Sequence, residues 1–261
     1  MVYRYKQAMA AGGYPISNIE GNKISAAIEK ISKSAGIVLY LSFPNNKYLS
    51  LQEIYQQFIE GMRNATWLEY IAVFSGIVSV WFSRKEDILV YPAGLINTTV
   101  YIYLSIKGSL FGEASVNLYY TIMSFYGWVL WSRRNVRKEH IVQVTYSDKQ
   151  WWLYQLSFFA SFYIVIFILL TYLKRDFAPN AIPWGDAFAS ATAFTGMWLM
   201  TKKKVESWYW WIATNIASIP LYFAKQYAFT SVYYLILLVM AVFGLIEWRK
   251  RAAKYRLSKS Q

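Results

Sequence analysis

The sequence contains no cysteine and only one histidine, His140. These absences exclude disulfides, thiol nucleophiles and zinc-finger spacings, together with most histidine-based metal sites. The HExxH, GxSxG and P-loop motifs are absent, as is any paired-carboxylate arrangement. No carboxylate or histidine lies in the middle of a long apolar segment, where proton relays and ion-coupling sites are usually found. We therefore expect no enzymatic activity, no cofactor and no coupling ion.

Charged residues are also scarce, at 16% of the 261 residues, whereas 56% are hydrophobic and 20% are aromatic. Soluble domains carry about 25% charged and roughly 45 to 50% apolar residues. The apolar excess therefore indicates a membrane protein. The net charge of +13, from 27 basic and 14 acidic residues, is compatible either with nucleic acid or with an anionic membrane face.

Hydropathy divides the chain into seven apolar segments of about 17 to 23 residues. About 20 residues are needed for a helix to cross the hydrocarbon core, and strands would be about half as long. The sequence thus predicts an all-α membrane protein with seven transmembrane helices. The predicted spans are 67–83, 88–106, 114–131, 151–173, 184–201, 207–224 and 231–248. Trp131 and Trp248, at two span ends, are expected to belong to the interfacial aromatic belt.

Basic residues are strongly asymmetric between alternate connections, with sixteen on one side and four on the other. Cytoplasmic loops collect Lys and Arg, which predicts an outside N-terminus and a cytoplasmic C-terminus. Because the charge is spread along one membrane face, we expect the lipid bilayer and not nucleic acid as the partner.

The chain also resembles itself at an offset of 117 or 118 residues. The five anchors are Trp81, Asn97, Lys107, Gly127 and Trp131, which align with Trp198, Asn215, Lys225, Gly244 and Trp248. This repeat predicts a 3+1+3 arrangement of two parallel three-helix repeats, with substrate bound between them near the midplane. The predicted units are an amphipathic extramembrane or interfacial segment (1–66), the first repeat (67–132), a basic loop with connector helix 4 (133–174), the second repeat (175–249) and a basic cytoplasmic tail (250–261).

A candidate site lies on the span 207–224. Trp208, Trp211 and Asn215 are spaced i, i+3 and i+7, so they share one helix face. Two indoles and an amide would suit a planar heteroaromatic ligand, above all a cationic ring. An interfacial anchoring role for the tryptophans is the alternative, but an amide deep in a membrane helix needs a partner or a wet cavity.

Further polar and aromatic residues on other spans point to the same central pocket. Hydrogen bonding between helices, worth about 0.6 to 2 kcal/mol each, is the alternative role for their polar groups. The full set of predicted substrate-binding residues is Trp208, Trp211, Asn215, Asn97, Asn117, Tyr120, Tyr101, Tyr234 and Trp128.

Several motifs between about Trp67 and Arg251 give the chain a specific likeness. They are Trp67-Leu-Glu-Tyr70, Gly94-Leu-Ile-Asn97, Tyr126-Gly-Trp-Val-Leu-Trp131, Gly196-Met-Trp-Leu199, Trp208-x-x-Trp211, Ile219-Pro-Leu-Tyr222 and Gly244-Leu-Ile-Glu-Trp248. With these motifs the chain resembles the PnuC family of nicotinamide riboside transporters. The resemblance implies a SWEET-like fold, a place in the bacterial inner (plasma) membrane and facilitated diffusion of nicotinamide riboside. The cationic ring, carboxamide and ribose of this vitamin suit the predicted pocket.

Two residues leave the cargo open, because family members often carry aspartate where Asn215 stands and glutamine where Asn117 stands. Thiamine and riboflavin are therefore alternative vitamins, and a sugar is a further alternative cargo. A seven-helix receptor that binds ligand without moving it is the alternative of a different class. Bundles of parallel repeats can form dimers or trimers, so a homo-oligomer is compatible with the prediction.

Overall fold

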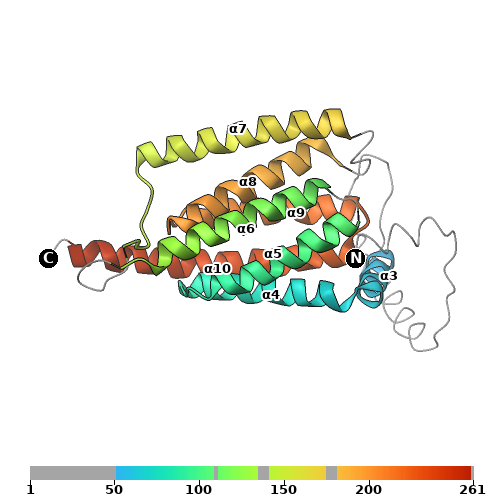
Figure 1. The fold of residues 1–261 in the computed structure, drawn as a ribbon, viewed down its shortest axis with the longest axis horizontal. Coiled ribbons are helices and arrows are strands. Elements are labelled where there is room, and N and C mark those ends of the chain that lie inside the picture. Colours follow the sequence, from blue (N-terminus) through green and yellow to red (C-terminus); the bar gives the residue numbers. More distant parts are fainter. Residues whose placement is uncertain (1–50, 109–110, 135–140, 175–180, 260–261) are drawn as a thin grey trace.

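The chain folds as a bundle of long helices in a computed structural model (Figure 1). The structure describes residues 51–108, 111–134, 141–174 and 181–259. Within these ranges it has eight helices and no strand. They are α3 (Leu51–Asn64), α4 (Trp67–Lys85), α5 (Val90–Lys107), α6 (Phe111–Ser132), α7 (Lys149–Leu173), α8 (Pro183–Thr201), α9 (Ser207–Ala224) and α10 (Ala228–Lys259). Helices α4 to α10 begin within three residues of the seven predicted spans.

Helices α4 and α8 begin in related ways. The α4 N-terminus has a capping box, in which Glu69 Oε2 accepts a hydrogen bond from the Thr66 N–H at 2.6 Å. At α8, Pro183 occupies the first turn and Asp186 Oδ2 accepts from the Ile182 N–H at 2.7 Å. These carboxylates satisfy N–H groups that the helix itself leaves unpaired.

Helix contacts follow a repeated pattern. In the first half α4 packs on α5 and α5 on α6, and in the second half α8 packs on α9 and α9 on α10. Two contacts join the halves, α4 with α10 and α6 with α8. Exchanging α4, α5 and α6 with α8, α9 and α10 leaves this set of contacts unchanged. Helix α7 packs on α8 at the side of the bundle (Figure 1).

Helix α10 is longer than its predicted span, because it continues from the apolar part through the basic segment to Lys259. The predicted span 231–248 therefore covers only part of this helix. The residues beyond Trp248 are mostly good helix formers. Ala252 is also buried against the aromatic residues at this end of the bundle, so the added turns are held by packing.

Among the described helices, two are long and apolar enough to cross a membrane by length and composition, Lys149–Tyr172 and Ala228–Lys259, and each contains an 18-residue stretch whose mean hydropathy is 2.1 or 2.3, respectively. A third candidate is the bent pair Ile54–Asn64 and Trp67–Lys85, whose axes meet at 109°. The remaining helices have many Trp, Tyr, Ser and Thr residues, which lower mean hydropathy. Large apolar side chains are nevertheless exposed on every helix from α4 to α10.

Helix α3 covers one end of α10. The Phe58 and Phe229 rings are 5.6 Å apart, and Gln57 Nε2 donates to Gln226 Oε1 at 2.6 Å. The sharp bend before α4 therefore places α3 across the end of the bundle opposite the C-terminus (Figure 1). The rest of the predicted N-terminal segment, residues 1–50, lies outside the described residues.

Candidate functional site

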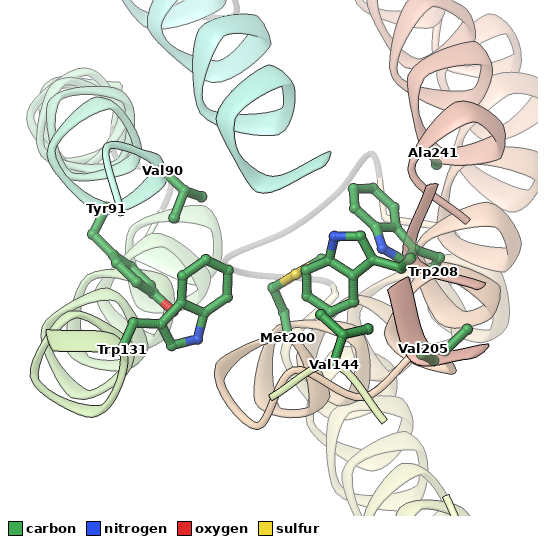
Figure 2. Close-up of a cluster of buried hydrophobic side chains, with 10 residues drawn as sticks. Val90, Tyr91, Trp131, Val144, Met200, Val205, Trp208 and Ala241 are labelled. Atoms are coloured by element: carbon green, nitrogen blue, oxygen red, sulfur yellow. The ribbon is translucent and has the colours of Figure 1, made fainter. Parts of the chain in front are cut away.

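An aromatic core closes the end of the bundle where the basic turns lie. Tyr91 packs edge-on against Trp131 at 5.2 Å between ring centroids, and Trp208 packs edge-on against Trp248 at 5.6 Å. Trp131 and Trp248 join the two pairs at 6.2 Å. Figure 2 shows Tyr91 and Trp131 on one side of this cluster and Trp208 on the other. We call these four residues the aromatic core.

Two of the three indoles in the aromatic core hydrogen-bond to the opposite half of the molecule. Trp131 Nε1 donates to the Thr201 carbonyl at 3.1 Å, and Trp248 Nε1 donates to the Ser83 carbonyl at 3.0 Å. Both side chains are buried, with exposures of 2% and 0%. The prediction that they belong to the lipid-facing belt is therefore wrong. These carbonyls lie in the last turns of α8 and α4, where the regular helical N–H partners run out, and they accept the indole N–H groups inside the bundle. The Ser83 carbonyl also accepts from the Glu86 N–H at 3.0 Å.

Trp208 belongs to the aromatic core and is 1% exposed. It lies directly on Gly244, where any added Cβ would collide with the indole, and Tyr91 lies on Gly127 in the same way. The structure thus places Trp208, a predicted ligand-stacking residue, in tight protein packing. Its Nε1 has no hydrogen-bond partner among the described residues.

Trp211 lies one helical turn further along α9, where it is only partly buried and packs against the edge of the same buried cluster. Its ring centroid is 6.2 Å from that of Tyr120 on α6. A Cβ added at Gly196 of α8 would be 3.2 Å from the Trp211 indole, so this glycine lets the ring lie flat against α8. No ring contact joins Trp211 to Trp208 in the described part of the chain. The predicted pair of indoles is therefore divided between two environments.

Tyrosines from four helices meet beside Trp211. Tyr222 and Tyr234 stack at 5.1 Å with an interplanar angle of 17°. Tyr233 packs edge-on against Tyr234 at 5.8 Å. Tyr101 of α5 lies close enough to Tyr233 and Tyr234 for their hydroxyls to interact electrostatically. With Tyr120 of α6, these residues form what we call the tyrosine cluster.

The tyrosine cluster has three predicted members, Tyr101, Tyr120 and Tyr234. Its five tyrosines lie between α5, α6, α9 and α10. Each of them is half-buried, so part of every side chain stays accessible. Sequence reasoning missed Tyr222 and Tyr233. A signal for Tyr222 was present, because Trp211, Asn215, Ser218 and Tyr222 continue a single helical stripe at spacings of four, three and four.

The three predicted asparagines have different environments. Asn97 Nδ2 donates to the Ala72 carbonyl of α4 at 2.6 Å, so it joins neighbouring helices within the first half. Asn117 Nδ2 donates to the Glu113 carbonyl of its own helix at 2.9 Å. Asn215 is 3% exposed, and no described residue hydrogen-bonds its amide. Of the three, Asn215 alone retains its full amide for another partner.

Trp128 lies apart from the tyrosine cluster. Its side chain is 37% exposed on α6, and no ring contact joins it to the cluster within the described ranges.

Charged side chains form no metal centre within the described ranges, since no group of three or more His, Asp or Glu side chains is arranged to hold an ion. At the opposite end from the aromatic core, Asp186 pairs with Lys225 at 2.5 Å.

The exterior and the interior of the bundle together indicate the class of protein. Apolar side chains cover the exterior of a helical bundle, while polar and aromatic side chains meet between its two halves, as in a multi-pass membrane protein. Residues 66–250 match the family model described as nicotinamide mononucleotide transporter. The chain belongs to this family, the PnuC transporters, and it is an inner-membrane transporter and not an enzyme.

Individual relatives are distant but cover most of the chain. The nicotinamide riboside transporter PnuC of Escherichia coli K12 is 23% identical over 211 residues, covering 72% of this chain and 87% of the relative. PnuC of Neisseria mucosa is 27% identical over 202 residues, covering 73% and 74%. The riboflavin/roseoflavin transporter RibM of Streptomyces davaonensis is 21% identical over 189 residues, covering 72% and 87%.

A solved structure has the same fold. The crystal structure of the vitamin B3 transporter PnuC matches with a TM-score of 0.60 at 24% identity. The match covers 78% of this chain and 90% of that chain.

Proposed function

We propose that this chain carries nicotinamide riboside across the bacterial inner membrane by facilitated diffusion. The observation that carries the proposal is the tyrosine cluster, which lies with Trp211 and Asn215 between the two halves of the bundle. The curated relatives from E. coli and N. mucosa are named as nicotinamide riboside transporters, which supports this cargo.

The proposed architecture is seven transmembrane helices in two parallel repeats, α4–α6 and α8–α10, joined by α7. Three pairs of residues exactly one repeat apart in sequence support it, because each pair is in contact. Ser83 Oγ lies 3.0 Å from Met200 Sδ, and the Trp131 and Trp248 rings are 6.2 Å apart. The third pair is Glu86 and Lys203. Symmetry-related residues contact each other only beside the axis that relates them, so these pairs mark a pseudo-twofold axis along the bundle.

The proposed substrate contacts are divided by chemistry. Trp211 and Tyr120 would face the cationic pyridinium ring, because aromatic faces attract cations more strongly where water is excluded. Asn215 would hydrogen-bond the carboxamide or ribose with the amide that no described residue occupies. Hydroxyls of the tyrosine cluster supply further donors and acceptors. Asn117 remains in the proposal through its amide oxygen, which accepts no hydrogen bond from described residues.

The remaining predicted residues receive other roles or stay predictions. Trp208 holds the aromatic core together and Asn97 holds α5 to α4, so we assign neither to the substrate. Trp128 stays a prediction. The basic end of the bundle is proposed to face the cytoplasm, on the sixteen-to-four asymmetry of Lys and Arg.

Facilitated diffusion is supported by where the buried acids lie. Among the described residues, the buried carboxylates are Glu69 in the first turn of α4 and Glu206 just before α9. Neither lies at mid-helix beside the tyrosine cluster, where a coupling proton or ion would need a carboxylate. Rocking of one repeat against the other would then expose the substrate to each side in turn.

Riboflavin is the second candidate cargo, because a relative at 21% identity is named as a riboflavin/roseoflavin transporter. Its ring system is neutral, whereas nicotinamide riboside and thiamine carry a cationic ring. Uptake of each labelled vitamin into proteoliposomes, with unlabelled competitors in excess, would test the proposal. Saturable uptake of the riboside that an ionophore does not alter is expected. Binding without uptake would instead support a receptor.

A further inference from the structure

We propose that Glu86 and Lys203 form a latch that holds the two repeats closed at the basic end of the bundle and must open to release substrate there. The proposal deepens the proposed function, because a latch has meaning only if the repeats move. We call this ion pair the latch.

The latch joins two sharp turns, one from each repeat. Glu86 follows α4 with φ at 63°, and Lys203 follows α8 with φ at 51°. Lys203 Nζ lies 2.6 Å from Glu86 Oε1, and the two side chains are 2% and 16% exposed. Arg251 of α10 adds a second contact to Glu86 at 3.3 Å. Left-handed backbone is uncommon for residues with a Cβ, so both turns hold a conformation that places these side chains toward each other.

The latch lies on the pseudo-twofold axis, since Glu86 and Lys203 are one repeat apart in sequence. Ser83 with Met200, and Trp131 with Trp248, occupy the same axis beside it. Lys203 Nζ is also 4.5 Å from the centroid of the Trp131 ring. An axis between two repeats is the direction in which substrate must pass. The latch and the aromatic core together therefore close the path at this end.

The turn that contains Lys203 is fixed to its own surroundings. The Thr145 N–H donates to the Lys203 carbonyl at 3.1 Å, and the Val205 N–H donates to the Thr145 carbonyl at 3.1 Å. Ser147 adds a bond from its N–H to Glu206 at 3.0 Å. These bonds hold the loop before α7 to the second repeat. If the two repeats rocked apart, Lys203 would move away from Glu86, whereas the loop would stay bonded to the second repeat.

A buried ion pair is a poor source of stability, because removing two charges from water costs about as much as their attraction returns. A charged pair between moving parts has a different advantage. In the closed state each charge is neutralised, and in the open state water reaches both charges, so neither state leaves a charge buried and alone. This is the property required of a latch.

The chain has no cysteine, so introduced thiols are the only ones present. Ser83→Cys with Met200→Cys should cross-link across the axis on oxidation. We expect substrate uptake to fall at least tenfold and to return on reduction. Thr192→Cys with Thr214→Cys is the matched control, because these hydroxyls lie 2.9 Å apart within the second repeat, where a cross-link should leave uptake unchanged.

A second measurement uses accessibility instead of uptake. Ser83 is 4% exposed, so Ser83→Cys should react slowly with a membrane-impermeant maleimide added on the basic side. Adding Glu86→Gln should raise the labelling rate at least tenfold, whereas Glu86→Asp, which keeps the negative charge facing Lys203 and Arg251, should stay nearer the parent rate. A labelling rate unchanged by Glu86→Gln, or unimpaired uptake in the oxidised Ser83–Met200 cysteine pair, would overturn the latch.

The two proposals fail in different ways. If the reduced cysteine variants and the parent all bind no vitamin and transport none, then the proposed function is wrong. The labelling experiment needs no substrate, so it still decides whether Glu86 and Lys203 hold the two repeats together.

Discussion

Replacing Trp211 by alanine should weaken substrate binding without unfolding the protein. Trp211 is half-buried, contacts Tyr120 at 6.2 Å between ring centroids and lies over Gly196. It is the indole that faces the tyrosine cluster, whereas Trp208 is enclosed by protein. Stacking of a heteroaromatic ring on an aromatic side chain is worth about 1 to 3 kcal/mol, which corresponds to a rise in Kd of about 5- to 160-fold.

The assay is a calorimetric titration of the detergent-purified variant with nicotinamide riboside. Trp211→Phe keeps an aromatic face and should retain most of the affinity. Trp208→Phe is the control, because it changes the same residue type one helical turn away. That substitution removes packing atoms from the aromatic core, so it should lower thermal stability more than affinity.

The opposite ranking would refute the reasoning. If Trp208→Phe lost affinity while Trp211→Ala bound normally, the substrate would contact the aromatic core, and the tyrosine cluster would be ordinary helix packing. If both variants bound nicotinamide riboside with nearly the parent affinity, then tryptophan stacking would not contribute to binding.

Three further predictions follow from the same structure. Gly244→Ala should lower the free energy of unfolding by about 1 to 3 kcal/mol in thermal denaturation, because its Cβ would collide with a buried indole, whereas Gly112→Ala, with open space around it, should not destabilise. Asn215→Asp should raise affinity for the cationic riboside relative to neutral riboflavin in parallel titrations, and an unchanged ranking would remove this residue from cargo selection. Burial holds the pKa of Lys203 below its usual 10.5, although its acidic partner opposes the shift and Arg251 adds to it. The latch is intact while Lys203 is protonated, so the labelling rate of the Ser83 cysteine, divided by its rate in the Glu86→Gln variant at the same pH, should rise as the pH passes through that lowered pKa, because the division removes the pH dependence of the thiol itself.

Helix positions could be predicted well from sequence, because membrane-length apolar segments have a clear signal. The span predicted at 207–224 coincides with α9, and the others begin within three residues of the observed helices. The end of α10 could not be predicted from hydropathy, because the helix continues through basic residues after the apolar part has ended. Helix propensity and the packing of Ala252 extend it, and a hydropathy window does not measure either property.

The repeat was a more informative signal than any single motif. Its anchors Trp131 and Trp248 are in contact with each other, although their position at span ends predicts a place in the interfacial aromatic belt. Sequence gives the face of a helix but not the side of the bundle to which that face turns. An indole at a helix end can thus anchor in the interface or fill the axis between the repeats, and only the neighbouring helices decide.

The candidate site was predicted in part. Helical spacing placed Trp208, Trp211 and Asn215 on one face, but it could not show that Trp208 contacts Trp248 whereas Trp211 contacts Tyr120. Tyr233 could not be found by extending a stripe within α9, because it comes from α10 and meets the cluster through the fold. Residues brought together from different helices depend on how the two halves pack, which spacing along a single helix does not reveal.

The most direct test of the central claim is uptake of labelled nicotinamide riboside by proteoliposomes that contain the purified protein, compared with the Trp211→Ala variant. The account predicts saturable uptake that needs no ion gradient, is competed by excess unlabelled riboside and is reduced in the variant. Absence of riboside uptake by protein that carries riboflavin or thiamine would contradict the proposed cargo. Uptake equal in the variant and the parent at every riboside concentration would contradict the proposed site.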